Sequence, residues 1–180
     1  MISEEQQTSL ISGCKAGNRQ AQEKLYRAFY RAMMNICLRY TKDDMDAMEA
    51  LNTGFYKVFK NIQLYDPAKA SLYTWIRAIV INSCLDLNGT KEKYIPSQEL
   101  TDAVDAAVDP EVILKLNAAR LLEIIRKLPA ATQTVFNLFI MEGYSHKEIA
   151  VLLNISEGTS KWHVNDARKK LQTILNEAHY

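Results

Sequence analysis

Side chains able to read duplex DNA are concentrated in the segment 156–170. They comprise hydroxyl, ammonium, indole, imidazole and guanidinium groups: Ser156, Thr159, Ser160, Lys161, Trp162, His163, Arg168 and Lys169. At the start of a helix such groups can reach base edges in the major groove, and cations further along suit phosphate. The segment therefore predicts duplex binding; a merely solvated polar face is the alternative.

Two residues of this segment fit that interpretation less directly. Asp166 would repel phosphate, so we expect it to point aside or to pair with Lys170 one helical turn on. Trp162 has two open interpretations. Its indole either lies exposed against a sugar or a thymine methyl, or it packs back on the domain.

A second group of chemical interest combines aromatic and basic residues between positions 60 and 77. Its members are Lys60, Tyr65, Lys69, Tyr73, Trp75 and Arg77. Aromatic faces stack on unpaired bases, and cations hold the backbone of a single strand. Aromatic residues at helical spacing also form cores, so composition alone leaves both interpretations open.

Enzymatic chemistry finds no support in the sequence. The chain has no catalytic Ser/His/Asp pattern, phosphate-binding loop or glycine fingerprint, which predicts a protein that is not an enzyme and needs no cofactor. The acids at 43, 44, 46 and 49 suit a helix start better than a metal site. The cysteines are expected to be buried free thiols, because no two form a CxxC pair: Cys14, Cys37 and Cys84.

The charge of the 180 residues is unevenly distributed along the chain. Residues 1–88 hold 11 Lys/Arg and 9 Asp/Glu (net +2), residues 89–110 hold 2 and 5 (net −3), and residues 111–180 hold 9 and 7 (net +2). The two basic blocks could each meet phosphate. The absence of a long apolar run and of a secretory signal predicts a cytoplasmic protein without a membrane span.

Helical periodicity dominates the first block and predicts an all-α fold. Three apolar stripes recur at steps of three and four, one in each of three helices: Leu25, Phe29, Met33, Ile36 and Tyr40; Leu51, Phe55, Val58, Phe59 and Ile62; Leu72, Trp75, Ile76, Ile79 and Val80. Thr41 is expected to cap the second helix, and Pro67 to separate it from the third.

The composition shifts at 89–110, which predicts an acidic, flexible linker between two small helical domains, 1–88 and 111–180. Helices are expected over 111–127 and 129–141, with Gly143 ending the latter. Ser145 and Glu148 form a capping box. Asn154 suits a tight turn, and a final helix follows from 157 to about 178, with Val164, Ala167 and Leu171 inward. This is the pattern of a helix-turn-helix unit.

Taken together, these segments resemble the extracytoplasmic-function (ECF) subfamily of RNA polymerase sigma factors. The resemblance covers nearly the whole chain in order and spacing. Its segments lie in a sigma-2-like and a sigma-4-like domain: 24–26, 37–41, 46–55, 57–59, 72–77, 81–82, 85–86, 128–129, Phe136, 143–145, 148–150, 158–159 and 167–171. The 72–86 stretch, similar to the promoter-melting helix, is the most specific.

The resemblance implies three sets of site residues and three partners. Core polymerase would bind Asp46, Glu49, Asn52, Phe55 and Lys57. The unpaired minus-ten strand would bind Tyr65, Asp66, Ala68, Lys69, Arg77 and Asn82, with a flipped base captured by the loop 61–70 and Asn82 behind it. The minus-thirty-five duplex would bind the eight residues of 156–170 introduced above. An anti-sigma protein is the third expected partner.

The chain departs from the family pattern at several of these positions. The polymerase-binding helix is less acidic than usual, because it carries Met48, Asn52 and Thr53. In the recognition helix, a small polar residue is replaced by Trp162 and a basic residue by Asp166. Two other hypotheses stay open on the sequence. One is a helix-turn-helix regulator that binds duplex DNA as a dimer without polymerase. The other is a decoy that binds polymerase without a promoter.

Overall fold

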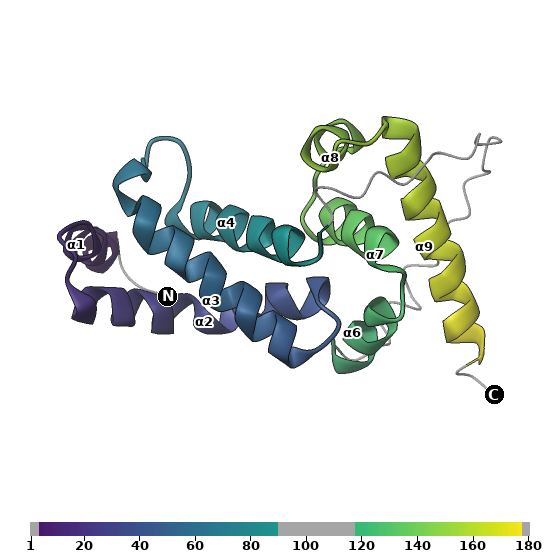
Figure 1. Ribbon diagram of the computed structural model, residues 1–180, viewed down its shortest axis with the longest axis horizontal. Helices are drawn as coiled ribbons and strands as arrows, with labels where there is room; N and C mark the ends of the chain where they lie inside the picture. The colour runs from purple at the N-terminus through teal and green to yellow at the C-terminus, as the bar shows by residue number, and fades with distance from the viewer. Residues whose placement is uncertain (1–3, 90–117, 178–180) are drawn as a thin grey trace. The chain divides into compact units, whose positions relative to one another are not determined.

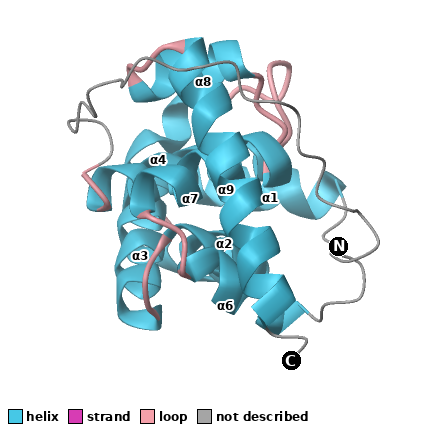
Figure 2. Ribbon diagram, turned by 90° about the vertical axis from the view of Figure 1, so that its right-hand side faces the viewer, coloured by secondary structure: helices cyan, strands magenta, loops and turns pink. Residues whose placement is uncertain are grey.

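The computed structural model describes residues 4–89 and 118–177, and every regular element within these ranges is a helix (Figures 1 and 2). The predicted all-α fold is therefore confirmed. The chain divides into two compact units, Met1–Leu87 and Asn88–Tyr180, which we describe separately. The predicted linker lies outside the described residues except for Gly89.

Residues 4–87 of the N-terminal unit form four α-helices and one short 3₁₀ turn. They are α1 (Glu4–Lys15), α2 (Arg19–Tyr40), α3 (Asp44–Asn61), η1 (Ile62–Leu64) and α4 (Leu72–Leu87). Helix α3 packs against both α2 and α4, and α1 packs against α2 (Figure 1). The loop 65–71 joins η1 to α4, so its position depends on the helices on either side.

The core of this unit is built from the three predicted apolar stripes. The inward residues include Leu25, Met33 and Tyr40 of α2, Leu51, Phe55 and Val58 of α3, and Leu72, Ile76 and Val80 of α4, all of them buried. Steps of three and four place such residues on one side of a helix, so burial removes a continuous apolar face from water. The three cysteines are free and buried, as expected.

Two glycines allow neighbouring helices to approach closely. A Cβ atom on Gly54 of α3 would lie 3.0 Å from Cγ2 and 3.2 Å from Cα of Val80 on α4. A Cβ atom on Gly13 of α1 would lie 2.6 Å from Cβ of Ala21 on α2. Both positions require the absence of a side chain, because protein interiors leave little room for added atoms.

The helix start at α3 corrects one sequence prediction. Asp43, not Thr41, caps this helix: its carboxylate accepts from the Asp46 amide at 2.9 Å. Thr41 instead ends α2, and its hydroxyl donates to the Cys37 carbonyl at 3.0 Å. Its side chain is buried and satisfied there, so the exposed aspartate two residues later takes the capping role.

The C-terminal unit contains α6 (Ala118–Arg126), α7 (Ala130–Phe136), η2 (Asn137–Met141), α8 (His146–Leu153) and α9 (Glu157–Glu177). Helices α6, α7 and α8 all contact α9. One core cluster is formed by Ile124, Ile125, Leu128, Phe136, Ala167, Leu171 and Leu175. Residues 111–117 of the helix predicted over 111–127 lie outside the described residues.

The predicted helix 129–141 is interrupted near its middle. After Phe136 the backbone widens into the π-helical turn η2, where the Glu142 amide donates to the Asn137 carbonyl five residues back. Such turns are rare and occur mostly as single turns within a helix. Gly143 then ends the element in the left-handed region, with φ of +77°, as predicted.

The helix-turn-helix signals are confirmed. The Ser145 hydroxyl accepts from the Glu148 amide, and the Glu148 carboxylate accepts from the Ser145 amide, which completes the capping box of α8. Asn154 ends α8 in the left-handed region. The Ser156 hydroxyl accepts from the Thr159 amide at 2.9 Å and begins α9. These contacts determine where α9 starts.

Candidate functional site

The first turns of α9 present fewer side chains to solvent than the sequence predicts. Lys161 and Trp162 are exposed, but Thr159, Ser160 and His163 are buried, with Ser160 0% and His163 4% exposed. These three side chains face the interior of their own unit, so Lys161 and Trp162 are the groups that these turns expose. The expected contact of Thr159, Ser160 and His163 with DNA stays a prediction.

Buried Ser160 is hydrogen-bonded to His146, the first residue of α8. His146 Nδ1 lies 2.9 Å from Ser160 Oγ. The imidazole of His146 also stacks on the Phe139 ring, with centroids 4.2 Å apart and planes inclined by 13°. Ser160 thus joins the two helices of the helix-turn-helix unit.

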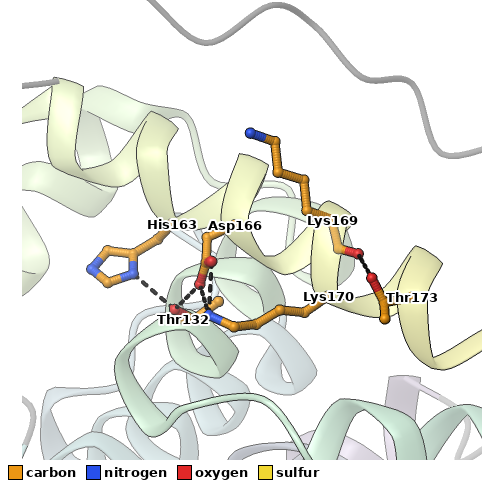
Figure 3. Close-up of polar contacts among 6 residues, drawn as sticks. All are labelled: Thr132, His163, Asp166, Lys169, Lys170 and Thr173. Carbon is orange, nitrogen blue, oxygen red and sulfur yellow. Dashed lines mark hydrogen bonds and ion pairs between the residues drawn. The ribbon is translucent and has the colours of Figure 1, made fainter. Parts of the chain in front are cut away.

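His163 belongs to a polar network that joins α9 to α7, shown in Figure 3. Its Nδ1 lies 3.0 Å from Thr132 Oγ1, and the Thr132 hydroxyl donates to Asp166 Oδ2 at 3.1 Å. Because a hydroxyl has one hydrogen to give, the proton of the imidazole is on Nδ1 and is donated to Thr132. The Lys170 ammonium completes the network at 2.6 Å and 2.7 Å from the two Asp166 oxygens.

This network settles the position of Asp166 as predicted. Its carboxylate pairs with Lys170 one turn on and does not stand alone on the surface. The positive charge of Lys170 is offset by the same ion pair with Asp166, so Lys170 has a different role from a cation at this end of α9 that makes no such pair. Lys169 is exposed, and its backbone carbonyl accepts from the Thr173 hydroxyl at 3.1 Å. Arg168 is half-buried.

The network makes the stability of the C-terminal unit depend on pH. Burial lowers the pKa of His163 below its ordinary 6.5, against a smaller opposing effect of Asp166. The unfolded chain then binds a proton more readily than the folded one. Stability is therefore complete above about pH 6.5 and falls as the pH decreases from there toward the lower pKa of the folded state.

We predict that the thermal midpoint of this unit is constant above about pH 6.5 and decreases as the pH falls below that value, by the equivalent of at most about 1.4 kcal/mol per pH unit for each histidine. The measurement is calorimetry at a series of pH values. Burial lowers the pKa of His146 too, so His163→Asn, which keeps a donor near the Nδ1 position, should remove only part of the slope. If the thermal midpoint depended on pH equally steeply in that variant, the contribution assigned to His163 would be contradicted.

In the N-terminal unit, some predicted site residues of the loop 65–71 are exposed to solvent, whereas another is buried beneath the loop. Pro67, Ala68 and Lys69 are exposed. Tyr65 is buried, its hydroxyl donates to the Ala70 carbonyl at 3.2 Å, and its ring contacts Trp75 with centroids 5.3 Å apart. Tyr65 therefore supports the loop, and its expected contact with DNA stays a prediction.

The polar contacts of this loop limit its freedom. Asp66 accepts from the Ala68 amide at 2.9 Å, the local bond typical of an Asx turn. Lys15 of α1 donates to the Tyr65 carbonyl at 3.4 Å, and Gln63 donates to the Lys15 carbonyl at 2.7 Å. The end of α1 thus braces the segment from which the loop departs. No pattern in the sequence predicted this role of Lys15.

The two predicted minus-ten residues on α4 lie further along this helix than its first turn, which follows the loop. Arg77 and Asn82 lie five and ten residues beyond Leu72, which on a helix corresponds to roughly 7.5 Å and 15 Å. Both side chains are half-buried, and the Asn82 amide donates to the Ala78 carbonyl of its own helix at 2.9 Å. The position of Asn82 behind the loop, which the resemblance implies, stays a prediction.

The predicted polymerase-binding residues divide between the surface and core of α3. Glu49 and Asn52 are exposed and Asp46 is partly exposed, whereas Phe55 is 2% exposed. Phe55 packs edge to face on Tyr26 with ring centroids 4.6 Å apart. Its ring fills the core beneath that surface, and its expected contact with polymerase stays a prediction.

Two polar pairs hold the remaining residues of this surface. The Tyr26 hydroxyl donates to Asn52 Oδ1 at 3.1 Å, which ties α2 to α3. Lys57 lies 2.8 Å from Asp86 Oδ2 and ties α3 to α4. Met45, Met48 and Tyr56 are exposed on the same helix. The surface thus combines carboxylates, an amide and apolar groups.

Comparison with protein families identifies both units. The model of "Sigma-70 region 2" matches residues 25–91, and that of "Sigma-70, region 4" matches residues 118–171. The ECF RNA polymerase sigma factor SigM of Mycobacterium tuberculosis is 25% identical over 176 residues, covering 96% of this chain and 86% of SigM. The chain belongs to the ECF branch of the sigma-70 family.

Further comparisons agree with this assignment. The RNA polymerase sigma-H factor of Pseudomonas aeruginosa is 23% identical over 194 residues, covering 99% of this chain and all of that protein. The solved structure of CnrH in complex with the cytosolic domain of CnrY has a TM-score of 0.51 at 20% identity, covering 93% and 96% of the two chains. That likeness concerns the fold.

As an ECF sigma factor, the protein is a transcription initiation factor that acts with core RNA polymerase on promoter DNA. The hypothesis of an independent helix-turn-helix regulator is not favoured, because region 2 matches most of the first unit. Within the part of the chain that the structure describes, no helix is long and apolar enough to span a membrane. No group of three or more potential metal ligands gathers among those residues either.

Proposed function

We propose that this sigma factor directs core polymerase to promoters through three surfaces, one for each of its tasks. The observation that supports the proposal best is that two family regions fold as separate units, and each exposes groups suited to a different form of DNA. The polymerase surface comprises the exposed side of α3, with Asp46, Glu49 and Asn52, and Lys57 at its border.

The minus-ten surface comprises the loop 65–71 and the exposed face of α4. Asp66, Ala68 and Lys69 lie in the loop, and Tyr73, 44% exposed, follows in the first turn of α4. Stacking on an exposed aromatic ring is worth roughly 1–3 kcal/mol per base, comparable to the cost of extruding a base from the duplex. Arg77 and Asn82 extend this surface along α4. Opening of the duplex then needs no ATP.

The minus-thirty-five surface comprises the exposed residues of α9. Lys161 and Trp162 stand at the start of the helix, where a recognition helix meets base edges, and Ser156 precedes them. Arg168 and Lys169 suit the phosphate backbone further along. The buried residues Thr159, Ser160 and His163 serve to position this face rather than to contact DNA.

The proposal extends to the setting of the protein. We place its action in the cytoplasm, where promoters are transcribed, and assign it no catalytic step of its own, because polymerase supplies the chemistry. The solved complex of CnrH with the cytosolic domain of CnrY supports a protein partner for this chain as well. An anti-sigma protein covering the exposed faces of either unit would keep the factor from polymerase.

Reconstitution with purified core polymerase tests the proposal. Gel filtration is expected to show comigration of this chain with core enzyme, and transcription from a genomic promoter library is expected to start at a defined set of sites. A dimer that binds duplex DNA without core enzyme would overturn the proposal in favour of an independent regulator. Comigration without any transcript would indicate a decoy.

The minus-thirty-five surface leads to a prediction for Lys161. Lys161→Ala should weaken promoter binding by the holoenzyme and reduce the slope of log affinity against log salt by about one unit, because one phosphate contact releases about one counterion. The measurement is a binding titration at several salt concentrations. Lys127→Ala, which removes an exposed lysine before α7, is the matched control. An unchanged slope would mean that Lys161 does not contact phosphate.

The minus-ten surface leads to a prediction for Tyr73. Tyr73→Ala should reduce promoter opening by about tenfold, the factor that corresponds to about 1.4 kcal/mol of lost stacking. Tyr73→Phe keeps the ring and should open promoters almost normally. Permanganate reactivity of unpaired thymines measures the open complex. Equal reactivity in the alanine and phenylalanine variants would refute stacking by this residue.

A further inference from the structure

Trp162 is the largest apolar side chain exposed on α9 among the described residues. It is 41% exposed and lies next to the exposed Lys161 in the second turn of the helix. Its ring is not without support: it meets the His163 ring edge to face, with centroids 4.9 Å apart and planes at 73°. Of its two open interpretations, the structure favours the exposed one.

The support beneath this ring is rigid. His163 is buried and donates to Thr132, which donates to Asp166, which pairs with Lys170. This network runs across two helices, so the imidazole has little freedom to rotate. A side chain held in place before binding loses less entropy when it meets its ligand. His163 is thus a positioning residue for Trp162.

The chemistry of an indole selects among the four bases. Its ring is apolar, and its single polar group, Nε1–H, donates and cannot accept. In the major groove, cytosine offers an amino donor, which an indole cannot pair, and adenine offers an amino donor beside its N7 acceptor but no methyl group. Guanine offers two acceptors and no apolar group. Thymine alone offers an acceptor, O4, beside a methyl group.

We propose that Trp162 reads a thymine in the minus-thirty-five element through its C5-methyl group. The inference rests on the proposed function, because it needs α9 to lie in the major groove. Lys161 holds the adjacent backbone or base, and the network of Thr132, His163 and Asp166 keeps the indole in the reading position. Promoters of this factor therefore carry a thymine at one constant position within the minus-thirty-five element.

Replacement of thymine by deoxyuridine tests this directly, because it removes the methyl and leaves the hydrogen-bonding groups. Each thymine of the minus-thirty-five region in a promoter found by reconstitution is replaced in turn, and binding by the complete holoenzyme is measured. At one position the replacement is expected to weaken holoenzyme binding about fourfold, which is the factor expected for the loss of one buried methyl group. Trp162→Ala should bind all these duplexes equally.

Two controls isolate the indole. Lys161→Ala should bind more weakly overall yet keep the fourfold deoxyuridine effect. Thermal unfolding should show that Trp162→Ala is folded, since the side chain is partly exposed and is not among the buried core residues. The inference is overturned if no position is sensitive, or if Trp162→Ala retains the sensitivity. A holoenzyme that forms no complex at any promoter would instead refute the proposed function, and this inference with it.

Discussion

Phe55→Ala is expected to lower the free energy of unfolding of the N-terminal unit by about 3–5 kcal/mol, the usual cost of removing a buried aromatic ring. Phe55 is 2% exposed and lies between Tyr26 and Phe59, with ring centroids 4.6 Å and 6.0 Å away. The loss combines the transfer of the ring to water with the cavity that remains. Weakened polymerase binding would follow from unfolding rather than from a lost contact.

The two tryptophans make this measurement selective. Trp75 lies in the N-terminal unit and Trp162 in the other. In a Trp162→Phe background, tryptophan fluorescence during denaturation therefore follows the unfolding of the N-terminal unit alone. Glu49→Ala is the matched control on the exposed side of α3. It should leave stability almost unchanged and reduce affinity for core polymerase. Full stability of Phe55→Ala would contradict the buried position of the ring.

The second large effect is expected at Gly54, where α3 meets α4. Gly54→Val should destabilise the N-terminal unit by about 3 kcal/mol, near the upper part of the usual range for an overfilled core. The added Cβ would already lie 3.2 Å from the Val80 Cα, and backbone cannot move aside as a flexible side chain can. Two further methyl groups increase the overlap.

Thr53→Val is the control for this substitution, since it places a valine at the adjacent exposed position of the same helix. It should change stability by no more than about 0.5 kcal/mol. Both variants are measured by urea unfolding in the Trp162→Phe background, with the fluorescence of Trp75 as the signal. If Gly54→Val proved as stable as the control, the close approach of α3 and α4 would be wrong.

Local signals in the sequence predicted the helices and their ends well. The capping box at Ser145, the left-handed Asn154 and the stripe of Leu25 to Tyr40 depend on residues within a few positions of one another. Such patterns need no knowledge of distant segments. Residues 89–110 and 111–117 lie almost wholly outside the described residues, so the predicted domain boundaries stay predictions.

The site was harder to predict, because exposure depends on which distant helix packs on each face. The inward stripe of α9 could have been continued back from Ala167 and Val164 by steps of four, which reaches His163 and Ser160. Thr132, the partner of His163, lies 31 residues earlier and has no local signal. For Phe55, the periodicity correctly placed the ring in the core, and only the family resemblance suggested a surface role.

Because each of the two units has its own packed interior, natural recombination between related genes could exchange one half of this protein and leave the other folded. A hybrid would combine the strand-opening preference of one parent with the duplex preference of the other. New promoter classes could then arise by shuffling whole modules, without intermediate forms that carry a damaged core.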